Sequence, residues 1–256
     1  MAGAAAAAPL IAAEPASAAR GMSQEFYELR FYRLRRGPMQ KRFDDFYREA
    51  ALPAINRAGT SPVGVFSLSA GGDTPGMYVL LPHKSADSVM QLWERVHADA
   101  EFQKAGAEFI NAAPTDPSYV RIESSLLVAF AGIPRLEVPA GTASKKARLF
   151  ELRTYESHSK KANKKKIEMF NNGEIAIFRR TGLTPVFFGE TLVGTKMPSL
   201  IYMLVFDDMA QRDKNWGTFV ADSEWKKLST TPGFTDPEIV SNISNVFLRP
   251  TNYSQI

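Results

Sequence analysis

The sequence repeats itself with one constant shift along its whole length. Glu28 returns as Glu151, an offset of 123 residues, and the segment Tyr27–Tyr32 around it returns as Phe150–Tyr155. The same offset relates four further features of the two halves: Gly59 and Gly182, Pro62-Val63 and Pro185-Val186, Trp93 and Trp216, and Asp99–Lys104 and Asp222–Lys227. A shared period indicates a shared supersecondary unit, and two copies indicate a duplicated domain rather than a solenoid.

Each copy shows the same order of predicted elements. In the first copy, alternating apolar residues predict strands and helical spacing predicts helices, in the order strand 26–34, helix 39–57, strand 63–68, strand 77–81, helix 86–111 and strand 119–130. The second copy repeats it as strand 149–156, helix 159–180, strand 186–193, strand 200–206, helix 209–228 and strand 239–248. The order β-α-β-β-α-β is that of a ferredoxin-like split unit.

These patterns predict an α+β protein with two domains. We place the first domain at residues 24–131, a Pro- and Gly-containing linker at 132–147 and the second domain at 148–256. Helices cover only one side of such a sheet, so its other side must be solvated or covered by another sheet. The duplication supplies a second sheet, and we expect the two units to pack sheet to sheet as a pseudo-dimeric α+β barrel.

Alternation in the first strand of each unit separates two sets of side chains. We expect the apolar set, with Tyr27, Leu29 and Phe31 in unit one, to pack on the helices. The opposite set would then lie between the two sheets, and it consists of Glu28, Arg30, Tyr32, Glu151, Arg153 and Tyr155. A charge in that position needs a partner.

The six residues of this opposite set are the candidate ligand-binding site, and two interpretations remain open. They can form a buried ion-pair ladder that fixes how the sheets dock. Alternatively, Arg30 and Arg153 can hold an anionic or carbonyl ligand while the tyrosines stack on it or donate hydrogen bonds.

Three segments of the sequence resemble the NIPSNAP family: Phe150–Tyr155, Asp222–Lys227 and Leu248–Ser254. The likeness spans residues 25–256 and is closer in unit two, because Phe102 stands where unit two has Trp225 and no Leu-x-Pro-x-x-Tyr-Ser ending follows the last strand of unit one. The resemblance implies a fold of the dimeric α+β barrel superfamily. It implies little about chemistry, since that superfamily mixes cofactor-free oxygenases, haem enzymes and plain binding proteins.

Few cofactor or metal sites fit the composition. The chain has no cysteine, which excludes disulfides, thiolate zinc sites and iron–sulfur clusters. Its histidines are His83, His97 and His158, and they do not pair at metal-ligand spacing. We therefore expect no metal and no cofactor, with haem on His83 or His97 as the alternative.

The leading hypothesis is a non-catalytic or weakly catalytic module that binds a small molecule in a cavity between the sheets. One alternative is an enzyme of the cofactor-independent oxygenase kind, acting on an aromatic or carbonyl compound. Another is a protein-interaction scaffold. A net charge of +4 does not argue for nucleic acid, and apolar runs are too short for a transmembrane segment. Self-association is left open.

Two further segments carry predictions of their own. Residues 1–23 are rich in alanine, and Ala16-Ser17-Ala18 has the form of a signal-peptidase site. This favours an exported, periplasmic protein, with a disordered tail on a cytoplasmic protein as the alternative. The lysines at 160–161 and 164–166 predict a solvated helix face, or else a surface for anionic head groups.

Overall fold

The computed structural model describes residues 23–72 and 75–256, and its strands form one closed barrel. Unit one comprises β1 (Phe26–Arg33), α1 (Pro38–Phe46), the π-helical turn η1 (Tyr47–Ala51), α2 (Leu52–Arg57), β2 (Gly64–Ala70), β3 (Gly76–His83), α3 (Ala86–Ala98), α4 (Ala100–Ala105), α5 (Ala107–Ile110) and β4 (Arg121–Ala129). A short 3-10 turn, η2 (Ala140–Thr142), lies in the segment between the units.

Unit two repeats this order. It comprises β5 (Leu149–Glu156), α6 (Lys160–Met169), the π-helical turn η3 (Phe170–Glu174), α7 (Ile175–Arg180), β6 (Thr184–Val193), β7 (Ser199–Phe206), α8 (Met209–Ala221), α9 (Ser223–Ser229), α10 (Asp236–Ile239) and β8 (Asn242–Pro250). The predicted α+β duplication is therefore confirmed, and Gly59 and Gly182 end the first long helix of each unit with a positive φ.

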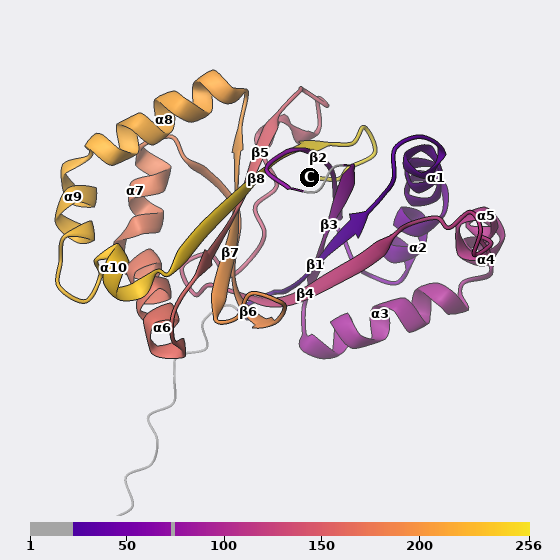
Figure 1. Cartoon of the computed structure of the whole chain (residues 1–256), viewed down its shortest axis with the longest axis horizontal. Coiled ribbons are helices and arrows are strands. Elements are labelled where there is room, and N and C mark those ends of the chain that lie inside the picture. The colour runs from indigo at the N-terminus through magenta and orange to yellow at the C-terminus, as the bar shows by residue number, and fades with distance from the viewer. Residues whose placement is uncertain (1–22, 73–74) are drawn as a thin grey trace, which may run out of the picture.

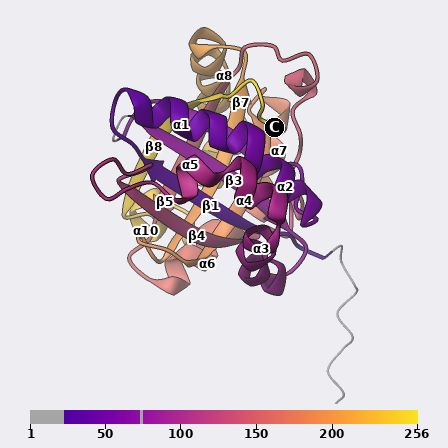
Figure 2. The same ribbon diagram turned by 90° about the vertical axis from the view of Figure 1, so that its right-hand side faces the viewer.

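The two sheets join at both edges. Their strand order is β1-β3-β2-β8-β5-β7-β6-β4, with β4 pairing back to β1. Within each unit the pairing is ferredoxin-like, and the units meet through the antiparallel pairs β2–β8 and β4–β6. Figure 1 shows the strands between two groups of helices, α1–α5 on one side and α6–α10 on the other. Figure 2 shows α1–α5 lying over their own sheet. Edge pairing leaves neither sheet with a free edge strand.

Three large apolar clusters follow from this layering. One lies between the unit-one helices and their sheet, one between the unit-two helices and theirs, and the third fills the barrel lumen between the sheets. In the lumen Tyr27 packs on Phe187 with ring centroids 5.1 Å apart, and Phe66 packs on Phe150 at 4.9 Å. These rings close the end of the lumen where β1 and β5 begin.

The second long helix of each unit is broken, where a single helix was predicted. Asp99 and Asp222 have extended backbones, and each carboxylate caps the helix that follows, Asp99 on Phe102 N and Asp222 on Trp225 N. Because an aspartate side chain competes for backbone N–H groups, it ends one helix and starts the next. Asp99 and Asp222 are separated by the repeat offset, so the helix is broken at the same position in both units.

Candidate functional site

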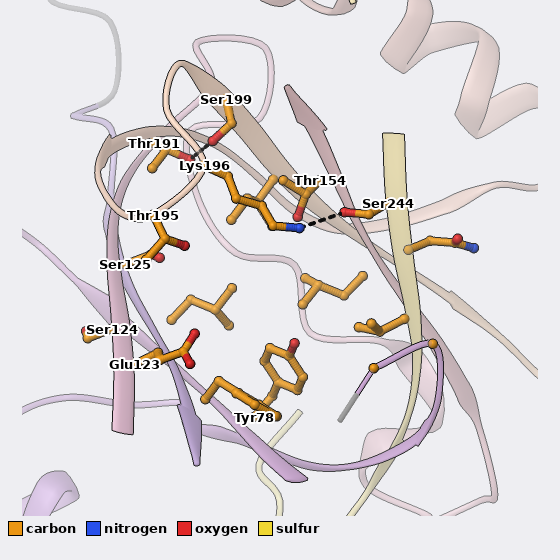
Figure 3. A pocket seen from close by; sticks show the side chains of 18 of the residues that line it. Tyr78, Glu123, Ser124, Ser125, Thr154, Thr191, Thr195, Lys196, Ser199 and Ser244 are labelled. Carbon is orange, nitrogen blue, oxygen red and sulfur yellow. Dashed lines mark hydrogen bonds between the residues drawn. The ribbon is translucent and has the colours of Figure 1, made fainter. Parts of the chain in front are cut away.

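The lumen is hollow at the opposite end, where β1 and β5 finish. A cavity of about 380 Å³ opens there between the two sheets. It is lined by Leu29, Phe31, Arg33, Gly71, Gly72, Tyr78, Glu123, Ser124, Ser125, Leu152, Thr154, Thr191, Thr195, Lys196, Ser199, Ile201, Ser244, Asn245 and Val246. Figure 3 shows strands of both units around this space. The volume is that of a small-ligand site.

Most of the lining side chains are apolar or carry a hydroxyl group. Leu29 and Leu152 come from the same position of β1 and β5 and belong to the apolar cluster of the lumen. Ser199 donates a hydrogen bond to Thr191 Oγ1 at 2.8 Å. A site of this kind can hold a ligand with an apolar body and a few oxygen substituents.

Charged side chains stand at the rim of the cavity and are paired there. Arg33 lies 3.8 Å from Glu123 in unit one. In unit two Lys196 Nζ lies 3.8 Å from Glu156 and donates to Ser244 Oγ at 3.3 Å, as Figure 3 shows for the serine contact. Pairing of this kind keeps the rim polar without giving it a large net charge.

The six sequence-predicted residues lie on the other face of their strands, under the helices. Their predicted placement between the sheets is wrong. In unit one Glu28 accepts hydrogen bonds from Arg30 Nε at 2.5 Å and Trp93 Nε1 at 3.0 Å, and the Arg30 guanidinium lies over the Trp93 ring. Ser124 Oγ adds a third bond to Glu28 at 2.8 Å. The third member, Tyr32, reaches the Tyr47 hydroxyl of η1 at 2.8 Å.

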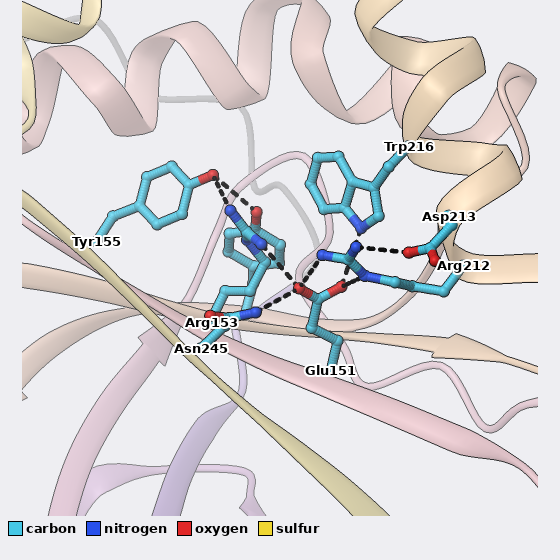
Figure 4. A network of polar contacts seen from close by, with 8 residues as sticks. Glu151, Arg153, Tyr155, Arg212, Asp213, Trp216 and Asn245 are labelled. Atoms are coloured by element: carbon cyan, nitrogen blue, oxygen red, sulfur yellow. Dashed lines mark hydrogen bonds and ion pairs between the residues drawn. The ribbon is translucent and has the colours of Figure 1, made fainter. Parts of the chain in front are cut away.

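Unit two holds the larger of the two networks, drawn in Figure 4. Glu151 is fully buried and accepts bonds from Arg153 at 2.7 Å, from Trp216 Nε1 at 2.9 Å and from Asn245 Nδ2 at 2.9 Å. Arg212 of α8 adds two more bonds, at 2.9 and 3.0 Å. Burial alone raises the pKa of a carboxyl group, but the donors and charges of Arg212, Arg153 and Trp216 outweigh it and lower the pKa of Glu151 to about 2.

The reversal of faces has a physical cause. In a closed barrel both faces of every strand are covered, so burial does not tell which face carries the charges. The helices bring an indole N–H in each unit, Trp93 or Trp216, and α8 brings Arg212 as well. The lumen face instead meets the apolar residues of the opposite sheet. Whether any of the six residues touches a ligand stays a prediction.

Sequence reasoning missed the residues that do line the cavity. Phe31 was expected to face the helices, yet it lines the lumen, as does Thr154 at the same position of unit two. The residues paired with them on the neighbouring strands line the cavity too. The two hairpin turns also contribute, through Gly71-Gly72 and Thr195-Lys196. The alternation of side chains along each strand did separate the lining residues from the charged ones, but it left open which of the two faces points into the lumen.

The lysine run of α6 is not a uniformly solvated face, as it was predicted to be. Lys166 is buried and bonds to Glu174 Oε2 at 3.0 Å, with the Phe170 ring 4.9 Å from its Nζ. Burial works against the charged form of Lys166, but the negative charge of Glu174 outweighs it and raises the pKa of the lysine. Lys160 and Lys164 remain exposed and both bond to the buried Glu190.

Neither histidine proposed as a haem ligand lines the barrel cavity. His83 is buried beneath α3, and its Nδ1 lies 3.0 Å from Ser88 Oγ. His97 is exposed, with its ring against Phe102 at 5.4 Å. Whether either residue holds a cofactor stays a prediction. Among residues 23–72 and 75–256, no cluster of three or more acidic or histidine side chains could hold a metal ion.

His83 makes the stability of the protein depend on pH. Burial, only partly offset by the charge of Glu28, lowers the pKa of His83 to about 4. In the unfolded chain the imidazole of this histidine takes up a proton near pH 6.5. The free energy of unfolding therefore keeps its full value above pH 6.5 and decreases as the pH falls from 6.5 to 4. We expect the free energy of unfolding to decrease by about 3 kcal/mol over this range. His83→Phe introduces the residue that unit two has at this position, Phe206, and should abolish this pH dependence.

Urea unfolding at pH 7.5, 6, 5 and 4 checks this expectation. Comparing the slopes of stability against pH removes any constant effect of the substitution. A wild-type slope that persists in His83→Phe would show that other groups cause the pH dependence. His97→Phe, which replaces an exposed histidine, is the matched control, and a slope that flattens in this variant as well would not be specific to His83.

Two other sequence predictions meet the structure only in part. No helix within the described residues is long and apolar enough to span a bilayer. Residues 1–22 of the predicted leader, with Ala16-Ser17-Ala18, lie outside the described residues, so export to the periplasm stays a prediction.

Comparisons with known proteins agree with this architecture. Two solved structures share the fold over most of their length, both of them proposed monooxygenases. The one from Lactobacillus acidophilus NCFM is 9% identical, covers 89% of this chain and 94% of its own, and has a TM-score of 0.56. The one from Fusobacterium nucleatum is 8% identical, covers 90% and 93%, and has a TM-score of 0.54. At such identities the likeness shows the fold alone.

Single-unit likeness is found as well. An uncharacterized NIPSNAP-like domain protein from Burkholderia xenovorans is 18% identical, covers 43% of this chain and 90% of its own, and has a TM-score of 0.39. Comparison with curated proteins gave no match. The NIPSNAP family model matches twice, at residues 27–130 and 150–255, which are the two units of the barrel. The chain therefore belongs to the NIPSNAP family and carries two NIPSNAP domains in tandem.

Proposed function

We propose that this protein binds a small molecule in the mouth of its barrel and does so without strong catalytic activity. The observation that carries the proposal is the cavity of about 380 Å³ between the two sheets, with an apolar floor and hydroxyl-bearing walls. Such pockets bury most of a small ligand and use a few polar groups to fix its orientation. A protein-interaction scaffold has no need of a cavity between its sheets.

The oxygenase alternative is supported by the fold of its neighbours but less by the cavity. Two proposed monooxygenases and an anthrone oxidase-like protein are among the matching structures, at 8–9% identity. A cofactor-independent oxygenase needs a base that removes a proton from its substrate. The carboxylate among the described lining residues is Glu123, which lies 3.8 Å from Arg33 and is half-exposed at the rim. Binding is therefore the function that the lining favours.

The six Glu, Arg and Tyr residues have a different part in this proposal. They tie each sheet to its own helices, through Trp93 in unit one and through Arg212 and Trp216 in unit two. A rigid frame of this kind keeps the opposite face of β1 and β5 in place at the cavity.

Filling the cavity tests the proposed function. Thr154→Phe places in unit two the residue that unit one has at the same position, Phe31, and occupies the lumen. We expect native mass spectrometry of the purified wild-type protein to show a bound small molecule that Thr154→Phe lacks. Ligand-observed NMR with a library of small apolar compounds that carry oxygen substituents should give hits that Thr154→Phe also loses.

Thr218→Phe is the matched control, because Thr218 is exposed on α8. It should keep every ligand that the wild-type protein binds. Ligands bound equally by Thr154→Phe and the wild type would contradict a site in the lumen. A wild-type protein that binds nothing in either assay would contradict the binding function itself.

A further inference from the structure

The duplication makes the two halves of the cavity comparable position by position. β1 and β5 both end at the mouth, and β3 and β7 both begin there. Leu29 and Leu152 are the same residue at the same place, so the floor is nearly two-fold symmetric. A ligand held by such a floor alone could lie in either of two orientations.

Above the floor the symmetry is broken. Unit one contributes Phe31 and Tyr78, whose rings are paired across the strands with centroids 4.7 Å apart. The equivalent residues of unit two are Thr154 and Ile201. One wall of the cavity therefore offers aromatic surface, and the facing wall does not.

The wall opposite the rings carries hydroxyl groups and a cation. Unit two contributes the hydroxyls of Thr154, Thr191, Thr195, Ser199 and Ser244. Lys196 belongs to the same wall, and Figure 3 shows its side chain reaching to Ser244. Its nearest carboxylate, Glu156, stands at 3.8 Å, which is longer than a hydrogen bond. The ammonium group can thus donate to a ligand as well.

We propose that the ligand is a flat aromatic ring carrying a carboxylate, bound in one orientation. Its ring lies against Phe31 and Tyr78, and its carboxylate faces Lys196, Thr154 and Ser244. Ring pairs of this kind favour offset or tilted stacking, and an ammonium donor strengthens a hydrogen bond to a carboxylate. Glu123 stands on the ring side, next to Arg33, so the carboxylate is directed away from it. This inference rests on the proposed binding function and adds the ligand class.

Three probe compounds separate the parts of this proposal in calorimetric titrations. 2-Naphthoate has both the ring and the carboxylate, 2-naphthalenemethanol has the ring without the charge, and octanoate has the charge without the ring. We expect 2-naphthoate to bind at least tenfold more tightly than either of the others. Binding no tighter than that of octanoate would overturn the aromatic part, and binding no tighter than that of the alcohol would overturn the carboxylate part.

Two variants assign the contacts. The double variant Phe31→Thr/Tyr78→Ile gives unit one the residues of unit two, and should weaken 2-naphthoate and the alcohol by about tenfold or more. Lys196→Met should weaken 2-naphthoate about tenfold and leave the alcohol unchanged. Lys161→Met, at an exposed position of α6, is the control for a general loss of positive charge and should bind like the wild type.

The outcomes distinguish the ligand class from the function. If the double variant binds 2-naphthoate as the wild type does, the ring wall is not used and the inference fails. If octanoate binds best and Thr154→Phe abolishes that binding, the lumen site stands and the aromatic class is wrong. If no probe binding responds to Thr154→Phe, the proposed site fails together with the ligand class.

Discussion

Replacing Glu151 with leucine is expected to lower the free energy of unfolding by about 3–5 kcal/mol, the cost of leaving buried charges without a partner. Glu151 is the acceptor shared by Arg153, Arg212 and Trp216, so its loss leaves the Arg153 guanidinium without a carboxylate and Arg212 with Asp213 alone. In a chain of this size the melting temperature should fall by on the order of 10 °C. Differential scanning calorimetry measures both changes.

Two control variants accompany Glu151→Leu: the equivalent substitution in unit one, and a double variant that also replaces Arg153. Glu28→Leu should cost less, because Glu28 pairs with one arginine, Arg30, which also stacks on Trp93. Glu151→Leu/Arg153→Met should recover much of the loss, since Arg212 is partly exposed and keeps Asp213 at 2.9 Å. A Glu151→Leu protein that melts with the wild type would show that the network is not tightly buried.

The network also gives an acid limb to the stability curve. The folded pKa of Glu151 is about 2, below the value of about 4.5 for the unfolded chain. The ionised Glu151 therefore makes its full contribution to the free energy of unfolding above pH 4.5, and this contribution is lost as the pH falls from 4.5 towards 2. The pH window of His83 runs from 6.5 to 4 and overlaps this one only between pH 4.5 and 4, so a single titration separates most of the two contributions.

Replacing Glu174 with alanine is expected to lower the free energy of unfolding by about 3–5 kcal/mol, because it removes the carboxylate 3.0 Å from the buried Lys166, and the remaining carboxylate, Asp236, is exposed and lies 3.9 Å away. Unit one shows how the same position is filled without charges: Phe43 stands for Lys166 and Ala51 for Glu174. The Phe43 ring stacks on Tyr47 at 4.5 Å. We therefore expect Lys166→Phe/Glu174→Ala to be as stable as the wild type or more so, since an apolar pair has no desolvation penalty.

Thermal and urea melts of the single and double variants check this expectation. Equal melting temperatures for Glu174→Ala and the wild type would show that Lys166 reaches water. A double variant no more stable than Glu174→Ala would show that the apolar side chains of unit one do not pack under α6 and η3, and that the ion pair also stabilises the fold by filling this space.

The duplication made most of the fold predictable. Two copies of one pattern had to agree, and elements such as the helix ended by Gly59 recurred at Gly182. The sheet-to-sheet packing followed from the bare face that each unit would otherwise expose. Edge pairing through β2–β8 and β4–β6 was not specified beyond the expectation of a barrel, because hydrogen bonds between backbones leave little trace in side-chain patterns.

The position of the site was harder to predict than the fold. The alternation correctly placed Glu28 and Arg30 on one face of the strand and Tyr27 and Leu29 on the other. It does not show which face points into the lumen and which lies under the helices. The deciding contacts were donors distant in sequence, such as Trp93 on Glu28. A composition rule that places charges away from helices fails when the helices supply the counter-charges.

Local breaks in the helices were missed for a related reason. Asp99 lies inside a long apolar-periodic segment, so periodicity continued through it, although its side chain caps a new helix. The π-helical turns η1 and η3 add one residue to a turn at the same place in both units, which periodicity cannot resolve at this length. They bring Tyr47 and Glu174 to their partners.

The most direct test of the central claim is a crystal structure of the protein grown with 2-naphthoate. The account predicts density between the sheets at the barrel mouth, with the ring against Phe31 and Tyr78 and the carboxylate near Lys196. Bound compound under the helices instead, beside Arg30 or Arg153, would contradict the assignment of the lumen as the binding site.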